Sequence, residues 1–209
     1  MSIANVGSRL LDIGGTRLFW WGKRVLDVVL SLLLLPALLV LACTLLLLNP
    51  WLNPGPLLYI QARVGRHDRL FRMYKFRTMR KGGPQVRFAD QESHRITGLG
   101  HLLRRYRFDE LPQIVNVLAG QMSLIGPRPE QPEFARQFMQ SLPGYARRHT
   151  IRPGLSGLSQ VVQGYTTDTD GTRRKLVLDL RYISECGVRM EAYVLWRTLI
   201  TVVTGRGAI

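Results

Sequence analysis

The stretch Val28–Leu48 reads VVLSLLLLPALLVLACTLLLL and holds 21 residues without a charged side chain. About 18 to 20 such residues suffice to cross a hydrocarbon core of roughly 30 Å. A cleaved signal peptide would begin earlier and end at small residues, whereas this stretch ends at Asn49-Pro50-Trp51. The stretch therefore predicts a membrane segment.

Pro36 interrupts this segment, because proline removes a backbone donor and clashes with the preceding turn. Both flanks are basic: Lys23 and Arg24 precede the segment, and most of the remaining Lys and Arg follow it. Basic flanks tend to stay in the cytoplasm. The sequence thus favours a re-entrant helix hairpin broken at Pro36, with a spanning, kinked helix as the alternative.

The composition of the chain narrows its class. Its 209 residues are 46% apolar, which excludes a disordered chain and suits one domain. Lys and Arg number 29 against 14 acids, a net charge of +15 that favours an anionic partner such as nucleic acid, a bilayer surface or a phosphorylated substrate. Two cysteines in different surroundings and four scattered histidines predict neither a disulfide framework nor a structural zinc site.

Beyond the membrane segment the pattern predicts an α/β fold with predominant helix, a short β-hairpin and interfacial amphipathic helices. The hairpin strands are Leu57–Val64 and Leu70–Met79, with a turn at Gly65–Asp68. Helices are expected at 101–107, 109–120, 133–141, 176–184 and 191–203. The predicted domains are a lead at 1–22, the re-entrant membrane helix at 23–52 and a cytoplasmic catalytic domain at 53–209.

The last predicted helix carries Tyr193, Trp196 and several aliphatic residues, a surface that suits a bilayer interface. Packing against the domain core is the alternative. The same apolar surface leaves a homodimer open.

Asp109-Glu110 is the candidate catalytic pair. Carboxylates at a helix start gain from exposed amides, which lower their pKa, although a plain helix cap is the simpler explanation. An aspartate can attack phosphorus, and a neighbouring glutamate can hold Mg²⁺ beside phosphate oxygens. Arg128 lies between Pro127 and Pro129, a backbone that preorganises its guanidinium for phosphate; the alternative is a rigid surface turn.

Five blocks of the chain resemble the bacterial sugar transferase family, the monotopic phosphoglycosyl transferases. They are Lys75-Phe76-Arg77-Thr78-Met79, the run 108–113 (FDELPQ), Asn116-Val117, the run 122–129 (MSLIGPRP) and the run 152–160 (RPGLSGLSQ). The pattern Lys23-Arg24-x-x-Asp27 before a proline-broken apolar segment is similar too. The resemblance runs from about Lys23 to the C-terminus.

The resemblance implies a transferase that moves a sugar 1-phosphate from a UDP-sugar to undecaprenyl phosphate at the cytoplasmic face of the bacterial inner membrane. The product would initiate exopolysaccharide, capsule, O-antigen or other glycan assembly. It further implies Asp109 as the nucleophile of a covalent intermediate and Glu110, beside Asp109, as the Mg²⁺ ligand. Arg128 would bind the phosphates, with anion contacts from Lys75, Arg77 and Arg152. It also supports the re-entrant hairpin at Pro36, and a minimal catalytic form without the added membrane bundle of larger relatives.

Two departures from the family pattern concern the site. Relatives often have serine where this chain has Arg107, and we expect Arg107 to be an additional phosphate ligand. Relatives often have Asn-Gly-Arg after Gln160, where this chain reads Val162-Gln163-Gly164-Tyr165, which leaves the sugar preference open.

Two other classes of protein would account for part of the sequence. A basic nucleic-acid-binding protein would account for the charge, but the chain has no recognition helix or finger motif and the apolar segment would be unexplained. A membrane-anchored scaffold without catalysis is disfavoured by the intact Asp109, Glu110 and Arg128. We therefore expect an enzyme and no nucleic-acid partner.

Overall fold

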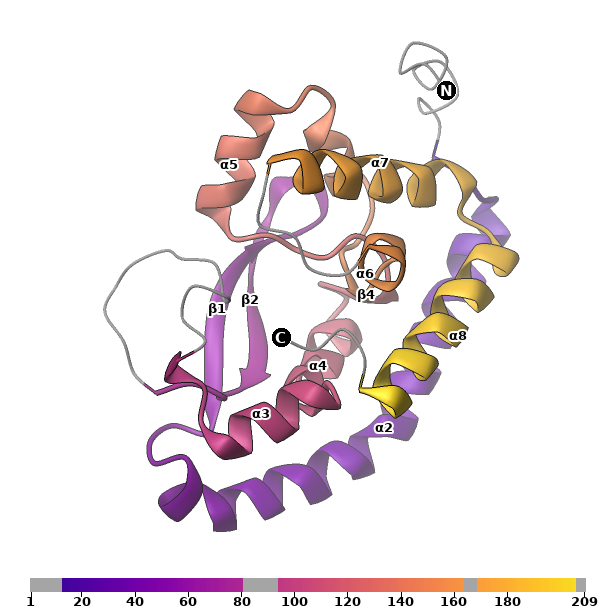
Figure 1. Ribbon diagram of the computed structural model, residues 1–209. Helices are drawn as coiled ribbons and strands as arrows, with labels where there is room; N and C mark the ends of the chain where they lie inside the picture. The colour runs from indigo at the N-terminus through magenta and orange to yellow at the C-terminus, as the bar shows by residue number, and fades with distance from the viewer. Residues whose placement is uncertain (1–12, 81–93, 164–168, 206–209) are drawn as a thin grey trace.

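The computed structural model describes residues 13–80, 94–163 and 169–205. The polar, glycine-containing stretch 81–91, which the sequence predicts to be a loop, lies outside this part of the chain, as do the departing residues Gly164 and Tyr165. The described residues form a mixed fold that is mostly helical, with two small sheets beside one long apolar helix (Figure 1).

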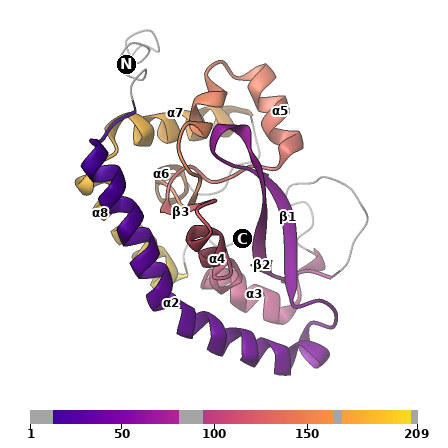
Figure 2. The same ribbon diagram turned by 180° about the vertical axis from the view of Figure 1, so that it is seen from behind.

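The long helix is α2 (Arg17–Leu52), which begins before the predicted boundary at Lys23. The Thr16 side chain caps it by accepting a hydrogen bond from Phe19 N at 3.2 Å. Pro36 lies inside the helix, and the two halves of α2 run in different directions in both ribbon views (Figure 1, Figure 2). A proline inside a helix removes one hydrogen bond and bends the axis, which accounts for this change of direction.

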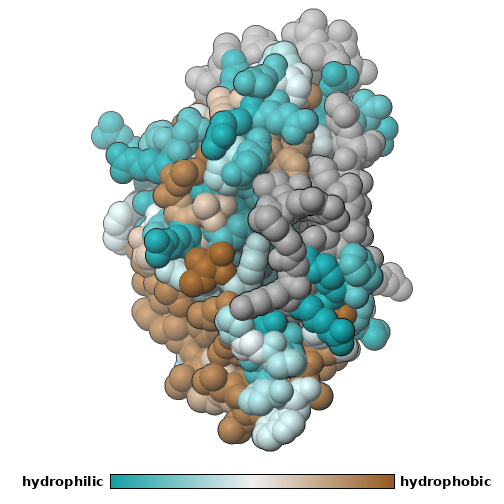
Figure 3. All heavy atoms as spheres, turned by 90° about the vertical axis from the view of Figure 1, so that its left-hand side faces the viewer, coloured by the Kyte–Doolittle hydropathy of each residue, from teal (hydrophilic) through white to brown (hydrophobic). Residues whose placement is uncertain are grey.

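The surface of α2 is apolar and largely uncovered. Its most apolar 18-residue window has a mean hydropathy of 2.8, and 11% of that window is buried. The helix is therefore long and apolar enough to cross a membrane, which indicates a membrane location. Figure 3 shows apolar side chains gathered over the lower part of one face, whereas polar side chains cover much of the upper part.

The predicted β-hairpin is confirmed. Strand β1 (Leu58–Val64) pairs antiparallel with β2 (Leu70–Phe76), in a register that places Tyr59 opposite Lys75. The short helical turn η2 (Arg66–Asp68) connects the strands. Phe71 and Met73 share one face of β2 and pack against Val117 and Met122, whereas Phe76, on the other face, packs against Leu45 and Leu103.

The helix expected at 109–120 is shorter than predicted. Helix α3 (Gly98–Arg105) leads into a single 3₁₀ turn, η4 (Phe108–Glu110), and α4 (Gln113–Leu118) begins only after Pro112. Pro112 is the residue before the helix, because it lacks the N–H that continued helical bonding requires. The acid pair thus lies in a turn before α4 and not in its first turn.

Asn116 fixes α4 against the hairpin. Its side-chain amide donates to Arg72 O at 2.7 Å and accepts from Tyr74 N at 3.2 Å, both on β2. Asn116 is fully buried, and one side chain therefore satisfies backbone groups that would otherwise lack partners inside the protein.

The C-terminal half surrounds a second, parallel sheet that the sequence did not predict, in which β3 (Ser123–Ile125) pairs with β4 (Gly154–Ser156). The remaining elements are α5 (Pro132–Ser141), η5 (Tyr145–His149), α6 (Leu158–Val162), α7 (Thr169–Glu185) and α8 (Val188–Thr204). Helices α5, α7 and α8 correspond to predicted helices. Ile125, Leu158, Tyr182 and Val194 form the main core among β3, α6, α7 and α8.

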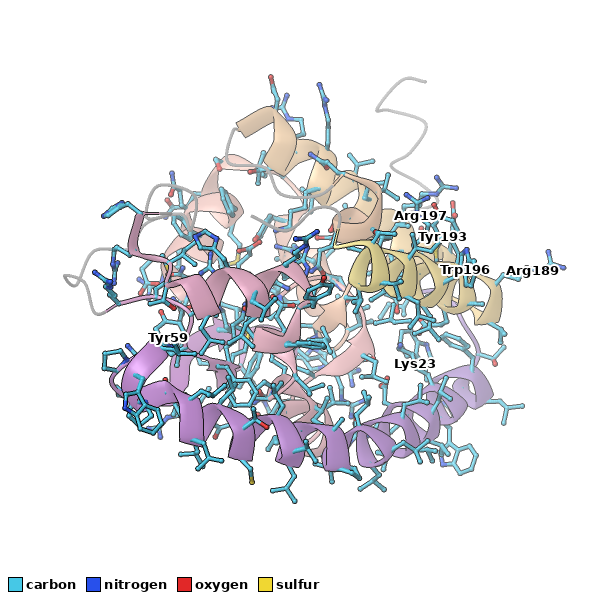
Figure 4. All side chains as sticks on the ribbon, turned by 60° about the horizontal axis from the view of Figure 1, so that its bottom comes forward. Lys23, Tyr59, Arg189, Tyr193, Trp196 and Arg197 are labelled. Carbon is cyan, nitrogen blue, oxygen red and sulfur yellow. The ribbon has the colours of Figure 1, made fainter. Side chains whose placement is uncertain are left out.

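Helix α2 is joined to this half by the Lys23-Arg24-x-x-Asp27 pattern. Lys23 forms a buried ion pair with Glu191 of α8, and Figure 4 shows Lys23 between the two helices. Arg24 donates to the carbonyls of residues 117 and 118 at the end of α4, at 2.7 and 3.1 Å. Asp27 accepts from Leu124 N at 3.0 Å. Three side chains on the first turns of α2 therefore bind three different elements.

Candidate active site

The acid pair is held in the short turn η4. Arg107, the residue before this turn, has φ 59° in the left-handed region, so the chain reverses sharply after α3. Glu110 N then donates to Arg107 O at 3.1 Å. The turn buries both acids, leaving Asp109 7% and Glu110 6% exposed.

Glu110 binds two of the predicted cationic residues. Lys75 Nζ, on β2, lies 3.0 Å from Glu110 Oε1. Arg128 approaches the same carboxylate with both terminal nitrogens, Nη1 at 3.2 Å from Oε2 and Nη2 in contact with Oε1. The hairpin, η4 and the loop after β3 thus converge on one carboxylate, and the structure brings Asp109, Glu110, Arg128 and Lys75 together, while phosphate binding by Arg128 and Lys75 stays a prediction.

The two acids have pKa values displaced in opposite directions. Burial raises the pKa of Asp109 from 3.8 to about 6, the charge of Glu110 adds to the rise, and Lys75 and the nearby arginines oppose it only in part. Burial also acts to raise the pKa of Glu110, but Arg128 and Lys75 outweigh it and hold that pKa well below its usual range. Near neutral pH Glu110 is thus a fixed anion, whereas Asp109 titrates close to the working range.

Arg104 is a site residue that sequence reasoning did not select. Its Nε donates to Thr78 Oγ1 at 2.9 Å, and its charge lowers the pKa of Asp109. The available signal was its place on the polar side of a helix that ends directly before the acid pair. Arg107 also lies beside the pair, since its charge helps to lower the pKa of Glu110.

The structure does not place Arg77 and Arg152 at the acid pair. The guanidinium of Arg77 is buried among backbone carbonyls and donates to those of residues 53, 56 and 79, so it fixes the end of α2 to the end of β2. Arg152 Nε donates to Gly120 O at 2.9 Å, and its charged neighbours are Arg24, Arg66 and Asp27. Anion binding by these two arginines stays a prediction.

A divalent cation would fit between Asp109 and Glu110 Oε2, because Lys75 and Arg128 Nη2 both bind Glu110 Oε1, whereas the contact of Oε2 with Arg128 Nη1 is longer, at 3.2 Å. Mg²⁺ prefers one or two carboxylates together with phosphate oxygens, and Asp109 and Glu110 are adjacent, buried carboxylates. The pKa of Asp109 is raised although Lys75, Arg104 and Arg128 are near, so burial of its charge is not fully offset. In the described part of the chain no group of three or more His, Cys, Asp and Glu residues could hold a metal ion, so a cation at the acid pair would need phosphate oxygens of a substrate as further ligands.

Comparison of the sequence with known proteins identifies its family. The family model described as bacterial sugar transferase matches residues 18–205. The chain belongs to this family. It is 42% identical over 89% of its length to a UDP-N-acetylgalactosamine-undecaprenyl-phosphate N-acetylgalactosaminephosphotransferase of Aeromonas hydrophila, and 39% identical over 87% to a UDP-glucose:undecaprenyl-phosphate glucose-1-phosphate transferase of Caulobacter vibrioides.

The lengths of the relatives differ from that of this family member. The matched region spans 44% of the Aeromonas protein and 70% of the Caulobacter protein. An exopolysaccharide production protein of Rhizobium leguminosarum is 37% identical over 88% of this chain, and there the match covers 97% of the relative. The family match at residues 18–205 spans the acid pair, both sheets and all but the first residue of α2.

Proposed function

We propose that this chain transfers a sugar 1-phosphate from a UDP-sugar to undecaprenyl phosphate, as the first step of exopolysaccharide, capsule, O-antigen or other glycan assembly. The observation that carries the proposal is the buried acid pair, in which Glu110 is bound by Arg128 and Lys75 and Asp109 is left to titrate near pH 6. The Aeromonas and Caulobacter relatives are named as transferases that use a UDP-sugar and undecaprenyl phosphate, which supports the same donor class and acceptor here.

The proposed reaction has two displacements at phosphorus. An ionised Asp109 Oδ attacks the phosphorus that bears the sugar, and the bond from this phosphorus to the bridging oxygen breaks, so that UMP leaves. The phosphate oxygen of undecaprenyl phosphate then attacks the same phosphorus and displaces the Asp109 carboxylate. The products are UMP, a lipid-linked diphosphate sugar and the regenerated enzyme, with no redox change.

The surrounding residues have distinct proposed roles. Arg128, Lys75 and Arg107 bind and orient the donor's phosphate oxygens, and Arg104 holds the Asp109 carboxylate in its ionised form. Glu110, with Asp109, is the proposed ligand of Mg²⁺, which when bound neutralises charge on the diphosphate. The buried turn η4 limits water at the nucleophile and so disfavours hydrolysis.

The proposal includes the placement at the membrane. We propose that α2 enters the inner membrane from the cytoplasmic side and returns at Pro36, which leaves the catalytic domain on the cytoplasmic face. Helix α8 would lie at the bilayer interface, since Tyr193 and Trp196 are exposed and Arg189 and Arg197 lie on the same helix (Figure 4). Aromatic and basic side chains of this kind favour a headgroup region.

Incubation of the detergent-solubilised protein with donor alone tests the proposal directly. A UDP-sugar labelled with ³²P at the sugar-bearing phosphate should leave one label on the polypeptide and release UMP, and adding undecaprenyl phosphate should remove the label. Asp109→Asn should abolish both labelling and turnover while the protein stays folded. Turnover without labelling, or labelling in Asp109→Asn, would refute the assignment of the nucleophile.

A further inference from the structure

Hydrogen bonds from other elements fix the backbone of the loop that carries Arg128. Four successive carbonyls, those of residues 127 to 130, accept hydrogen bonds in chain order from Gly154 N (2.9 Å), Arg148 Nη2 (2.9 Å), Arg63 Nη1 (3.1 Å) and Val64 N (3.0 Å). The donors come from β4, η5 and β1, so three elements fix this loop. The bond to Arg128 itself is made by the side chain of Arg148.

Arg148 is buried in a polar network that includes Asp179 of α7. It is 4% exposed, and its Nη2 lies 2.8 Å from Asp179 Oδ2 as well as 2.9 Å from Arg128 O. Asp179 is 1% exposed and also accepts a hydrogen bond from Ser159 Oγ at 2.7 Å. Tyr145 Oη accepts from Arg148 Nη1. One nitrogen of Arg148 thus joins the carboxylate of α7 to the backbone of the Arg128 loop.

One face of α7 binds the end of β3 just before this loop, is linked to Arg128 through Arg148, and binds Glu130 at the end of the loop. Lys175, Asp179 and Tyr182 are spaced by four and three residues, which places them on the same side of a helix. Tyr182 Oη lies 3.1 Å from Ile125 O, Asp179 binds Arg148, and Lys175 binds the Glu130 carboxylate. In Figure 1, α7 lies across the top of the molecule, whereas α3, the helix that leads into η4, lies in its lower half, so these residues act on the site through the loop.

We propose that Arg148, held by Asp179, is a positioning residue that sets the Arg128 guanidinium against Glu110 and the donor phosphate. The proposal rests on the proposed function. Arg148 touches neither Glu110 nor the reacting atoms; it fixes the carbonyl of the residue whose side chain does. Because a displacement of about 1 Å at a reacting group can cost roughly 100-fold in rate, a small movement of this backbone is enough to matter.

Arg148→Lys is the discriminating variant. Lysine keeps a positive charge for Asp179, but one compact ammonium cannot reproduce the fork that also reaches Arg128 O. We expect kcat/KM for the donor to fall about 10- to 100-fold while the melting temperature changes little. Arg181→Lys is the matched control, because Arg181 lies on α7, the helix of Asp179, in an exposed pair with Glu185.

A double-mutant cycle separates positioning from general damage. In an Arg128→Ala background, Arg148→Lys should cost less than about threefold, since the side chain that it positions is gone. Arg181→Lys should cost little in either background.

The outcomes are distinguishable. Equal losses with and without Arg128, or full activity of Arg148→Lys, would each overturn the positioning role. Asp179→Asn provides the same cycle if Arg148→Lys does not fold, and failure of both to fold would assign the network to folding and also overturn the proposal. Inactive wild-type protein would instead refute the proposed function.

Discussion

Replacing Asp109 by asparagine should stabilise the protein above pH 6. The pKa of this buried carboxyl is raised from 3.8 to about 6, mainly by desolvation and then by Glu110. A pKa unit corresponds to about 1.4 kcal/mol, so ionising Asp109 in the folded state costs about 3 kcal/mol of stability. Asp109 is 7% exposed, so solvent screening does not reduce this figure substantially.

The sign and the pH window follow from the two pKa values. Below about pH 4 Asp109 is protonated in both folded and unfolded protein, and the variant should match the wild type. Between about pH 4 and 6 the unfolded chain ionises first, so wild-type stability falls relative to Asp109→Asn. Above pH 6 the full cost applies, and for a chain of this size about 3 kcal/mol corresponds to roughly 6 to 12 °C in melting temperature.

Thermal unfolding in detergent at pH 4 and pH 7.5 measures this difference. Comparing the variant with wild type at each pH cancels the other acids, among them Glu130, whose pKa is lowered to about 2 by Lys175 and Arg148 against the opposing effect of burial. Asp170→Asn, at an exposed position of α7, is the control and should show no such pH dependence. An Asp109→Asn difference that is the same at both pH values would refute the reasoning.

Three further outcomes are expected. The rate of donor-only labelling should fall about tenfold per pH unit below about pH 6, because protonated Asp109 cannot attack; a flat rate from pH 5 to 7 would contradict this. Arg77→Met should lower the free energy of unfolding by about 2 to 4 kcal/mol, because three backbone carbonyls lose their donor. Arg72→Met, at an exposed position of β2, is the control and should change the melting temperature little in the same assay. Lys23→Met should lower the free energy of unfolding by about 3 to 5 kcal/mol, because the buried Glu191 loses its cationic partner. The double change with Glu191→Met should recover much of this loss, and purely additive shifts in melting temperature would argue against the pair.

Local patterns predicted the parts of the fold that depend on neighbouring residues. The uncharged run in α2 and the alternation in β1 and β2 are visible in consecutive residues, and these elements were predicted. The parallel pair of β3 and β4 was not, because each strand has only three residues and the partner lies some thirty positions away. A ladder this short carries no periodicity from which a strand could be inferred.

In the candidate site, too, the residues in short local motifs were predicted better than those whose position depends on distant parts of the chain. Asp109, Glu110 and Arg128 stand in short motifs that restrict their own backbone, and the structure brings them together. Alternation along the predicted strand Leu70–Met79 would put Lys75 and Arg77 on one side, but β2 ends at Phe76, so Arg77 leaves the ladder and turns toward the end of α2. Alternation predicts a common face only while the ladder continues.

The opposite pKa displacements of the two acids connect the fold to the proposed chemistry. Asp109 and Glu110 are adjacent and equally buried, yet both close cationic contacts, Arg128 and Lys75, are made to Glu110. A carboxylate whose oxygens are held by a guanidinium and an ammonium is a poor nucleophile, because its lone pairs are engaged and its charge is stabilised. Asp109 keeps a destabilised negative charge, which an attack on phosphorus would relieve. Environments that push two pKa values apart separate the roles of paired carboxylates, and here this separation depends on Arg128, the residue whose backbone α7 holds through Arg148.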